Sequence, residues 1–211
     1  MFKRNQVEEA IASVLEPGSA KPSSEMRTRL KRLLETDRAL GRSKRSSDPE
    51  RANFAFSGMD APGRGFENWF TGYEAFALLT GLRLMRDGWP QGLVVAVLCR
   101  VKPDLERHHA RVLRQDPMVL FDDDQVRQQA RPGSLGVSNT DPVFLVINSK
   151  DRECDTGANP AAICQGQAEL MDLIKARGPG QTWTVMELGT SIHALSLALT
   201  KTEPRKRGRA S

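Results

Sequence analysis

The chain has 211 residues, of which 39% are hydrophobic and 27% are charged, and its formal net charge is +5. The length suits one folded domain with a smaller second one, and no apolar stretch approaches the ~20 residues that a membrane-spanning helix needs. The N-terminus turns polar at Lys3 and lacks the apolar core of a signal peptide, so we expect a cytoplasmic protein with no membrane partner.

Charge is unevenly distributed along the chain. Residues 1–115 hold 20 basic and 14 acidic residues, residues 116–203 hold 7 basic and 12 acidic residues, and residues 204–211 hold 4 basic residues and no acidic one. Asymmetry between the parts of a chain is a better guide to a polyanionic partner than the total charge. The sequence therefore predicts that the N-terminal part and the extreme C-terminus attract phosphate.

Helical periodicity recurs through the first 115 residues. It predicts a short amphipathic helix over residues 3–15, an apolar helix over residues 73–86 and a further helix that Pro90 opens. Pro103 marks the start of another helix, because proline is favoured in the first helical turn. We therefore expect an N-terminal domain that is mainly α-helical.

The helix predicted over residues 25–40 carries the functional hypothesis. Ser24 is the expected helix-starting residue, and Gly41 is the expected C-cap. Asp37 falls on the apolar stripe of this helix, so we expect either that the last turn frays or that the helix prediction is wrong there. The stripe contains Met26, Leu30, Leu33, Leu34 and Leu40, and the opposite face contains Arg27, Thr28, Lys31, Arg32, Glu35 and Arg38.

Positive charge on the outer face of this helix suits a DNA duplex. The major groove admits an α-helix, and side chains near the helix N-terminus reach the base edges. Arg27 and Arg32 can clasp guanine, Thr28 can touch a thymine methyl group, and Lys31 can neutralise phosphate. Backbone phosphate is the expected contact of Arg29 on the flank. Arg38 completes the candidate set on this helix. The alternative is a solvated amphipathic helix whose charges serve solubility.

A hairpin is predicted between this helix and residue 73. Phe54 and Phe56 alternate as strand residues do, and residues 62–65 form the expected hairpin tip. Arg64 at the tip would act as a wing on neighbouring phosphates or the minor groove, and an ordinary exposed turn is the alternative. Sequence-independent attraction to phosphate is expected from the basic residues Arg42, Lys44, Arg45, Arg205, Lys206, Arg207 and Arg209.

Three short segments share their order with a known family. Residues 2–7 (FKRNQV) open the first helix, residues 73–78 (YEAFAL) open the apolar helix, and residues 88–91 (GWPQ) start the next one. Together with the basic helix and the hairpin, these segments make residues 1–100 resemble the MerR-type winged helix-turn-helix. The resemblance implies a homodimer that binds an inverted-repeat promoter and controls transcription. It implies base and backbone contacts at residues 27–32 and a wing at Arg64.

The pattern changes after residue 115. Residues 122–124 are the expected capped start of a helix, residues 143–147 and 182–188 are expected strands, and residues 165–176 are an expected helix. Residues 192–199 fit a helix or a strand. The expected fold class is α+β, mainly α. The expected parts are a winged helix-turn-helix domain over 1–115, a linker over 116–142, a smaller α+β dimerisation or partner domain over 143–203 and a disordered basic tail over 204–211.

Motifs for catalysis or metal binding are weak. Cys99, Cys154 and Cys164 are separated by 55 and 10 residues, which matches no compact metal site. His108 and His109 are adjacent, so on a helix they point about 100° apart. No phosphate-binding loop, nucleophile elbow or dinucleotide motif occurs in the sequence. We therefore expect no enzyme, no metal and no cofactor.

The sequence thus predicts a sequence-specific double-stranded DNA-binding transcriptional regulator. The MerR-type resemblance implies that it acts as a homodimer, and we expect association with the nucleoid, with RNA polymerase as a further candidate partner. The alternative is a protein-interaction adaptor that uses a winged-helix scaffold and contacts nucleic acid only incidentally. A third hypothesis, an enzyme in the C-terminal half, would require a pocket with clustered polar groups at residues 143–199.

Overall fold

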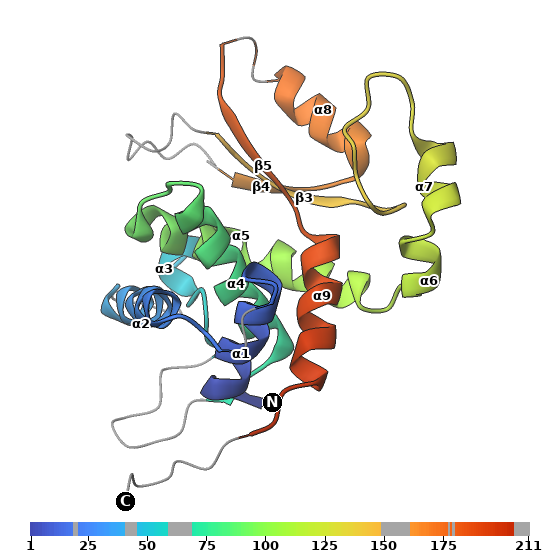
Figure 1. The fold of residues 1–211 in the computed structure, drawn as a ribbon. Helices are drawn as coiled ribbons and strands as arrows, with labels where there is room; N and C mark the ends of the chain where they lie inside the picture. Colours follow the sequence, from blue (N-terminus) through green and yellow to red (C-terminus); the bar gives the residue numbers. More distant parts are fainter. Residues whose placement is uncertain are drawn as a thin grey trace, which may run out of the picture. The chain divides into compact units, whose positions relative to one another are not determined.

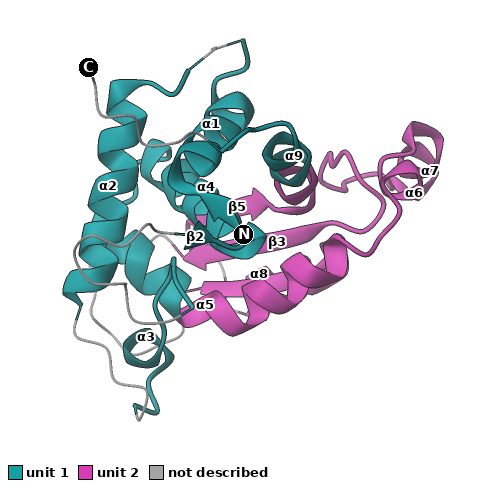
Figure 2. Cartoon of the chain, turned by 90° about the horizontal axis from the view of Figure 1, so that it is seen from below, with its two compact units in different colours: residues 1–99, 194–211 teal, residues 100–193 magenta. Residues whose placement is uncertain are grey.

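The computed structural model describes residues 1–18, 21–40, 46–58, 69–148, 161–176, 178 and 180–204. Helices predominate in this part of the chain and are accompanied by a two-stranded and a three-stranded sheet, which confirms the expected α+β class (Figure 1). The chain divides into two compact units, coloured separately in Figure 2: residues 1–99 with 194–211, and residues 100–193. None of the described helices is both long and apolar enough to span a bilayer.

Unit 1 is built on three helices, α1 (Arg4–Leu15), α2 (Ser24–Ala39) and α4 (Gly72–Arg86), all of which the sequence predicted. Both α1 and α2 pack against α4, whose residues are buried along most of its length. Gly81 permits close packing, because a Cβ atom there would lie 3.3–3.4 Å from side-chain atoms of Leu33, Phe56 and Leu98. A larger residue at Gly81 would push these neighbours apart.

The two ends of the described chain meet in unit 1. Strand β1 (Phe2–Lys3) pairs antiparallel with β2 (Trp69–Phe70). The side-chain amides of Asn5 and Gln6 donate hydrogen bonds to the carbonyls of Glu203 and Thr202, at 3.1 and 3.0 Å. The residues that follow α9 (Gly189–Thr200) therefore lie beside α1, although we expected them in the C-terminal domain.

Unit 2 contains a three-stranded antiparallel sheet in the order β4-β3-β5. The central strand β3 (Val143–Asn148) is buried along its whole length and pairs antiparallel with β5 (Trp183–Glu187), and both strands were predicted. Strand β4 (Ala161–Gln165) completes the sheet and was not predicted. The helix α8 (Gly166–Ala176) packs on one face of the sheet, where Phe144, Val146, Cys164 and Leu170 form an apolar cluster.

The expected linker over residues 116–142 is part of unit 2 and contains two short helices, α6 (Pro117–Leu120) and α7 (Asp123–Gln129). Asp122 caps α7 by accepting a hydrogen bond from the backbone N–H of Gln125, which confirms the predicted capped start. The boundary between the units falls after residue 99, whereas we expected it after residue 115. Residues 205–211, most of the expected basic tail, lie outside the described residues.

Pro103 does not open a helix, contrary to the prediction. It lies inside α5 (Gln91–Val112), which begins directly after Pro90 as expected. Proline has no N–H, so the carbonyl of Cys99, four residues earlier, cannot receive its usual helical hydrogen bond. The side-chain amide of Asn53 donates to that carbonyl at 3.4 Å and partly replaces the missing donor. The helix therefore continues past the proline.

The prediction of a first hairpin strand around Phe54 and Phe56 is also wrong. Residues 53–58 form bends and coil, and they follow the single-turn helix α3 (Pro49–Ala52). The backbone N–H groups of Ala55 and Phe56 donate to the carboxylate of Asp37 on α2, so this carboxylate satisfies them in place of a neighbouring strand. The expected hairpin tip at residues 62–65 lies outside the described residues.

Candidate nucleic-acid interface

The helix α2 has the two faces that its sequence predicted. Met26, Leu30, Leu33 and Leu34 are buried. Its outer residues Arg27, Thr28, Lys31, Arg32, Glu35 and Arg38 are exposed, and Arg29 on the flank is partly exposed. Burial of the apolar stripe fixes the rotation of the helix about its own axis, and this in turn directs the basic side chains to solvent.

Two details at the ends of α2 differ from the prediction. The N-cap is Ser23, whose hydroxyl oxygen accepts a hydrogen bond from the N–H of Met26 at 3.2 Å, and Ser24 is already helical. Leu40, expected on the buried stripe, is the C-cap and is 38% exposed. Gly41, the expected C-cap, lies outside the described residues.

Asp37 stabilises the last turn of α2, where its position on the apolar stripe had suggested fraying. Asp37 is buried, and its two carboxylate oxygens accept hydrogen bonds from the backbone N–H groups of Ala55 and Phe56 at 3.0 and 3.1 Å. The thiol of Cys99 lies 3.7 Å from one of these oxygens. Asp37 is therefore a structural residue that ties α2 to the segment after α3.

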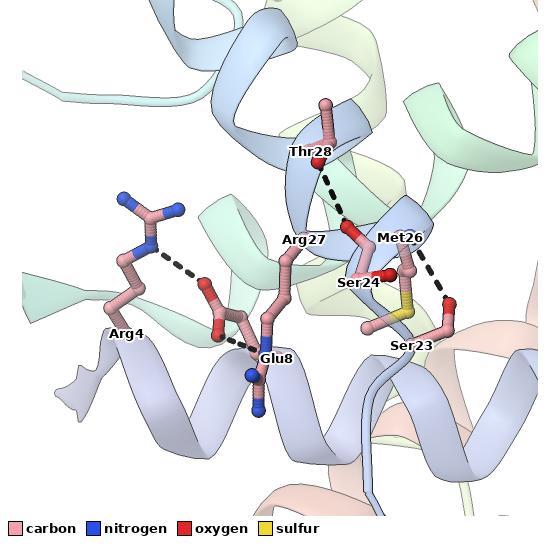
Figure 3. A network of polar contacts seen from close by, with 7 residues as sticks. All are labelled: Arg4, Glu8, Ser23, Ser24, Met26, Arg27 and Thr28. Carbon is pink, nitrogen blue, oxygen red and sulfur yellow. Dashed lines mark hydrogen bonds and ion pairs between the residues drawn. The ribbon is translucent and has the colours of Figure 1, made fainter.

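Three of the candidate DNA-binding residues already pair with carboxylates. Arg27 reaches Glu8 of α1, with 3.5 Å between Nε and Oε2, and Figure 3 shows its side chain extending from α2 towards α1. Along α2 itself, Arg29 pairs with Glu25 at 2.5 Å and Lys31 pairs with Glu35 at 3.7 Å. The side chains of Lys31 and Glu35 are 64% and 58% exposed, and a pair so exposed to water is weak and exchangeable. The side chain of Arg27 is 51% exposed, but that of its partner Glu8 is only 14% exposed.

Arg32 and Arg38 are exposed and make no ion pair with any residue that the structure describes. The backbone beneath Arg32 is fixed, because its carbonyl accepts a hydrogen bond from the side-chain amide of Gln91 at 3.2 Å. The same amide bonds to the hydroxyl of Thr36. Arg32 thus has a guanidinium group without an ion-pair partner among the described residues, on an anchored stretch of helix.

Thr28 offers its methyl group rather than its hydroxyl. The hydroxyl donates a hydrogen bond to the carbonyl of Ser24 at 2.9 Å, one turn earlier in the helix (Figure 3). A threonine whose hydroxyl is bonded to the backbone retains an apolar methyl group for contact with a thymine methyl group. Contact with a thymine methyl group stays a prediction for Thr28.

The remaining candidate residues lie outside the described residues. They are the loop residues Arg42, Lys44 and Arg45, and Arg64 at the expected wing tip. At the described edge of that segment, Trp69 of β2 is 46% exposed, and the ammonium group of Lys3 lies 5.3 Å from its ring centroid. This cation–π contact adds a positive charge beside the strand pair.

Sequence reasoning missed two residues of α1 that belong to this surface. The guanidinium group of Arg4 donates through Nε to Glu8 at 2.7 Å, and Glu8 is the carboxylate that also pairs with Arg27 (Figure 3). The spacing of four between Arg4 and Glu8 is visible in the sequence as a helical pair. Their link to Arg27 is not visible, because it joins residues of two different helices.

No metal-binding arrangement is found among the described residues, where no group of three or more metal-ligating side chains occurs. Burial and the nearby Glu169 raise the pKa of the Cys164 thiol to about 11, which keeps it protonated at neutral pH. Cys99 is buried, and Cys154 lies outside the described residues. Burial lowers the pKa of His109 to about 4, so His109 is neutral at physiological pH.

Unit 2 has a surface pocket of about 600 Å³ between the end of α7, the segment before β3 and the start of α8. Most of its lining residues precede residue 143, outside the interval that the enzyme hypothesis requires. The buried amide oxygen of Asn139, at its edge, has no hydrogen-bond partner among the described residues. The amide nitrogen of the same residue donates to Glu187 at 2.8 Å.

Comparison with known proteins found no match to a family model, a curated protein or a solved structure. The functional argument for this chain therefore depends on the geometry of its own residues.

Proposed function

We propose that this protein is a sequence-specific, double-stranded DNA-binding transcriptional regulator that acts as a homodimer. In this proposal α2 enters the major groove, and the pair β1–β2 supports a wing in a winged helix-turn-helix arrangement of the MerR type. The expected contact with RNA polymerase and the association with the nucleoid belong to the same proposal.

The observation that carries the proposal is the outer face of α2. This face presents basic side chains, two of which, Arg32 and Arg38, are free of ion pairs among the described residues. The opposite face of the helix is fixed by buried leucines and by Asp37. A groove-binding helix needs a rigid inner face and a cationic outer face, because free guanidinium groups bind guanine edges and phosphates through several N–H donors.

Salt dependence of binding tests the proposal. Each lysine or arginine that neutralises a phosphate steepens the fall of affinity with salt. We expect Lys31→Ala to reduce the slope of log K against log salt by about 1 for a fluorescently labelled duplex. Arg51→Ala is the matched control, because Arg51 is 77% exposed in the same unit but lies on α3. An equal reduction in both variants would mean that α2 has no special role.

One observation favours the alternative function of a protein-interaction adaptor. Arg27, Arg29 and Lys31 each pair with a glutamate, so part of the outer face of α2 alternates in charge. A surface of alternating charge suits a protein partner of matching pattern better than a uniform polyanion. An adaptor would retain no duplex at physiological salt in the same titration.

A further inference from the structure

The carboxylate of Glu8 joins two arginines of different helices, and this arrangement extends the candidate interface from α2 to α1. Oε1 of Glu8 lies 2.7 Å from Nε of Arg4, and Oε2 lies 3.5 Å from Nε of Arg27. Figure 3 shows the two guanidinium groups approaching the carboxylate from different sides, Arg4 from α1 and Arg27 from α2. Glu8 is 14% exposed, whereas both arginine side chains are 41% exposed or more.

Both ion pairs use the same atom of each arginine. A guanidinium group has five N–H donors, of which Nε supplies one, so four donors on the two terminal nitrogens of each arginine are left. Neither Arg4 nor Arg27 has another hydrogen-bond partner among the residues that the structure describes. The carboxylate thus restrains each guanidinium group by its inner edge and leaves the outer nitrogens available for an external anion or base.

We propose that Glu8 is a positioning residue for DNA binding, and that Arg4 is a phosphate contact beside Arg27. This inference rests on the proposed function of α2. Arginine loses side-chain freedom when it binds a base or a phosphate, and a restraint present before binding reduces that cost. The ordered guanidinium group of Arg27 then prefers the correct base, because its donors face one direction before the duplex arrives.

The net charge of Glu8, Arg4 and Arg27 together decides whether Glu8 positions the arginines for DNA or prevents them from binding it. One carboxylate shared by two guanidinium groups leaves a net positive charge, so the group still attracts a polyanion. In the pair with Arg27 the atoms Nε and Oε2 are 3.5 Å apart, Glu8 is 14% exposed and Arg27 is 51% exposed, so the carboxylate side is held by the protein while the arginine side stays open to a ligand. Glu8 therefore orders the arginines without cancelling their attraction for phosphate.

The test compares Glu8→Gln with Glu106→Gln, an exposed glutamate of unit 2 whose replacement removes the same charge. Affinity is measured for the duplex that the wild-type protein selects from random sequence and for a scrambled duplex of equal composition. We expect Glu8→Gln to lower the ratio of the two affinities roughly fivefold. Glu106→Gln should leave the ratio unchanged, because loss of a charge that pairs with neither Arg4 nor Arg27 affects both duplexes alike.

Two further variants separate the possible outcomes. In an Arg27→Lys background, which keeps the charge but lacks Nε–H, Glu8→Gln should not change the ratio further. Arg4→Gln should weaken both duplexes equally, as loss of a phosphate contact does. An unchanged ratio in Glu8→Gln overturns the positioning role while the proposed function stands. A wild-type protein that selects no sequence overturns the proposed function itself, and the inference with it.

Discussion

The outer face of α2 and the cluster around Asp141 in unit 2 both join a basic side chain to a carboxylate, but they differ in their exposure to water. On α2, the paired side chains of Lys31 and Glu35 are 64% and 58% exposed. In unit 2, Arg111 and Asp141 are 31% and 29% exposed, and Nη1 lies 2.6 Å from Oδ2. Exposed pairs can be exchanged for an external anion at little cost, whereas removal of one partner of a partly buried pair leaves the other charge unpaired inside the protein.

The Asp141 cluster includes more than one pair. The same Oδ2 accepts a hydrogen bond from the side-chain amide of Gln115 at 2.6 Å, and Oδ1 accepts one from Gln165 at 3.2 Å. Nε and Nη2 of Arg111 are buried without a hydrogen-bond partner among the described residues. A carboxylate beside an arginine therefore does not define the role of that arginine, because the exposure of the guanidinium group decides whether its donors are available to a ligand: Arg4 and Arg27 are 41% and 51% exposed, and Arg111 is 31% exposed.

Replacement of Asp37, on the buried side of α2, should cause the largest loss of stability. Asp37→Ala leaves the buried N–H groups of Ala55 and Phe56 without their acceptor. Because each hydrogen bond to a charged group contributes about 1.5–3 kcal/mol, we expect the free energy of unfolding to fall by about 3–4 kcal/mol. Urea denaturation measures it, and Asp37→Asn, which keeps one oxygen, should lose less. Equal stability of Asp37→Ala and the wild type would contradict the structural role of Asp37.

Burial in unit 2 also predicts a pH dependence of stability. The pKa of His109 is lowered from 6.5 to about 4, mainly by burial. Above pH 6.5 the residue is neutral in both states, and between pH 6.5 and about 4 only the unfolded chain takes up a proton. Stability therefore falls as the pH drops through this window, by about 2–3 kcal/mol at pH 4.5.

The variant His109→Gln isolates this contribution. The difference in unfolding free energy between pH 7 and pH 4.5 should be about 2–3 kcal/mol smaller in the variant than in the wild type. Urea denaturation at the two pH values gives both differences. If the variant and the wild type lose the same stability on acidification, His109 does not remain neutral in the folded protein.

Removal of the Asp141 carboxylate in unit 2 should cause an intermediate loss of stability. Asp141→Ala takes the acceptor from Arg111 and Gln115 together. We expect a loss of about 2 kcal/mol in unfolding free energy, less than for a fully buried pair because the group is nearly one third exposed. Thermal unfolding monitored by circular dichroism measures the loss. Unchanged thermal stability would place this cluster with the exchangeable pairs of α2.

The outer face of α2 gives the smallest expected effect on stability. Glu35→Gln removes the partner of Lys31, and their nitrogen and oxygen are 3.7 Å apart. Exposed pairs of this kind contribute about 0.3–0.5 kcal/mol, so the change in unfolding free energy should stay below about 0.5 kcal/mol. A loss above about 1 kcal/mol in urea denaturation would show that the outer pairs are structural, and the comparison between the two regions would fail.

Periodicity predicted the two faces of α2 because burial of a helix follows its 3.6-residue repeat. It could not assign Asp37, since the acceptor role depends on backbone groups 18 and 19 residues further along the chain. The link from Glu8 to Arg27 was hidden for the same reason. Local patterns specify the helices, whereas the partners of polar side chains depend on how those helices pack.

The errors in the strands and at Pro103 have similar causes. Strand β4 consists mainly of residues with little β preference, including Ala161 and Ala162, and it is stabilised by pairing with β3. The alternation of Phe54 and Phe56 predicted a strand. Phe56 is instead buried by tertiary packing while its backbone forms a bend. The rule that proline starts a helix failed at Pro103, since α5 continues past it and Asn53 donates to the Cys99 carbonyl.

The central claim is that the outer face of α2 reads DNA sequence. Selection of bound duplexes from a random pool at physiological salt tests it most directly, with the wild type and Arg32→Ala in parallel. We predict that the wild type enriches an inverted repeat and that Arg32→Ala loses preference at one base pair of each half-site, by about 1–3 kcal/mol. A wild-type pool without any enriched sequence, or the same enriched sequence for both proteins, would contradict the claim.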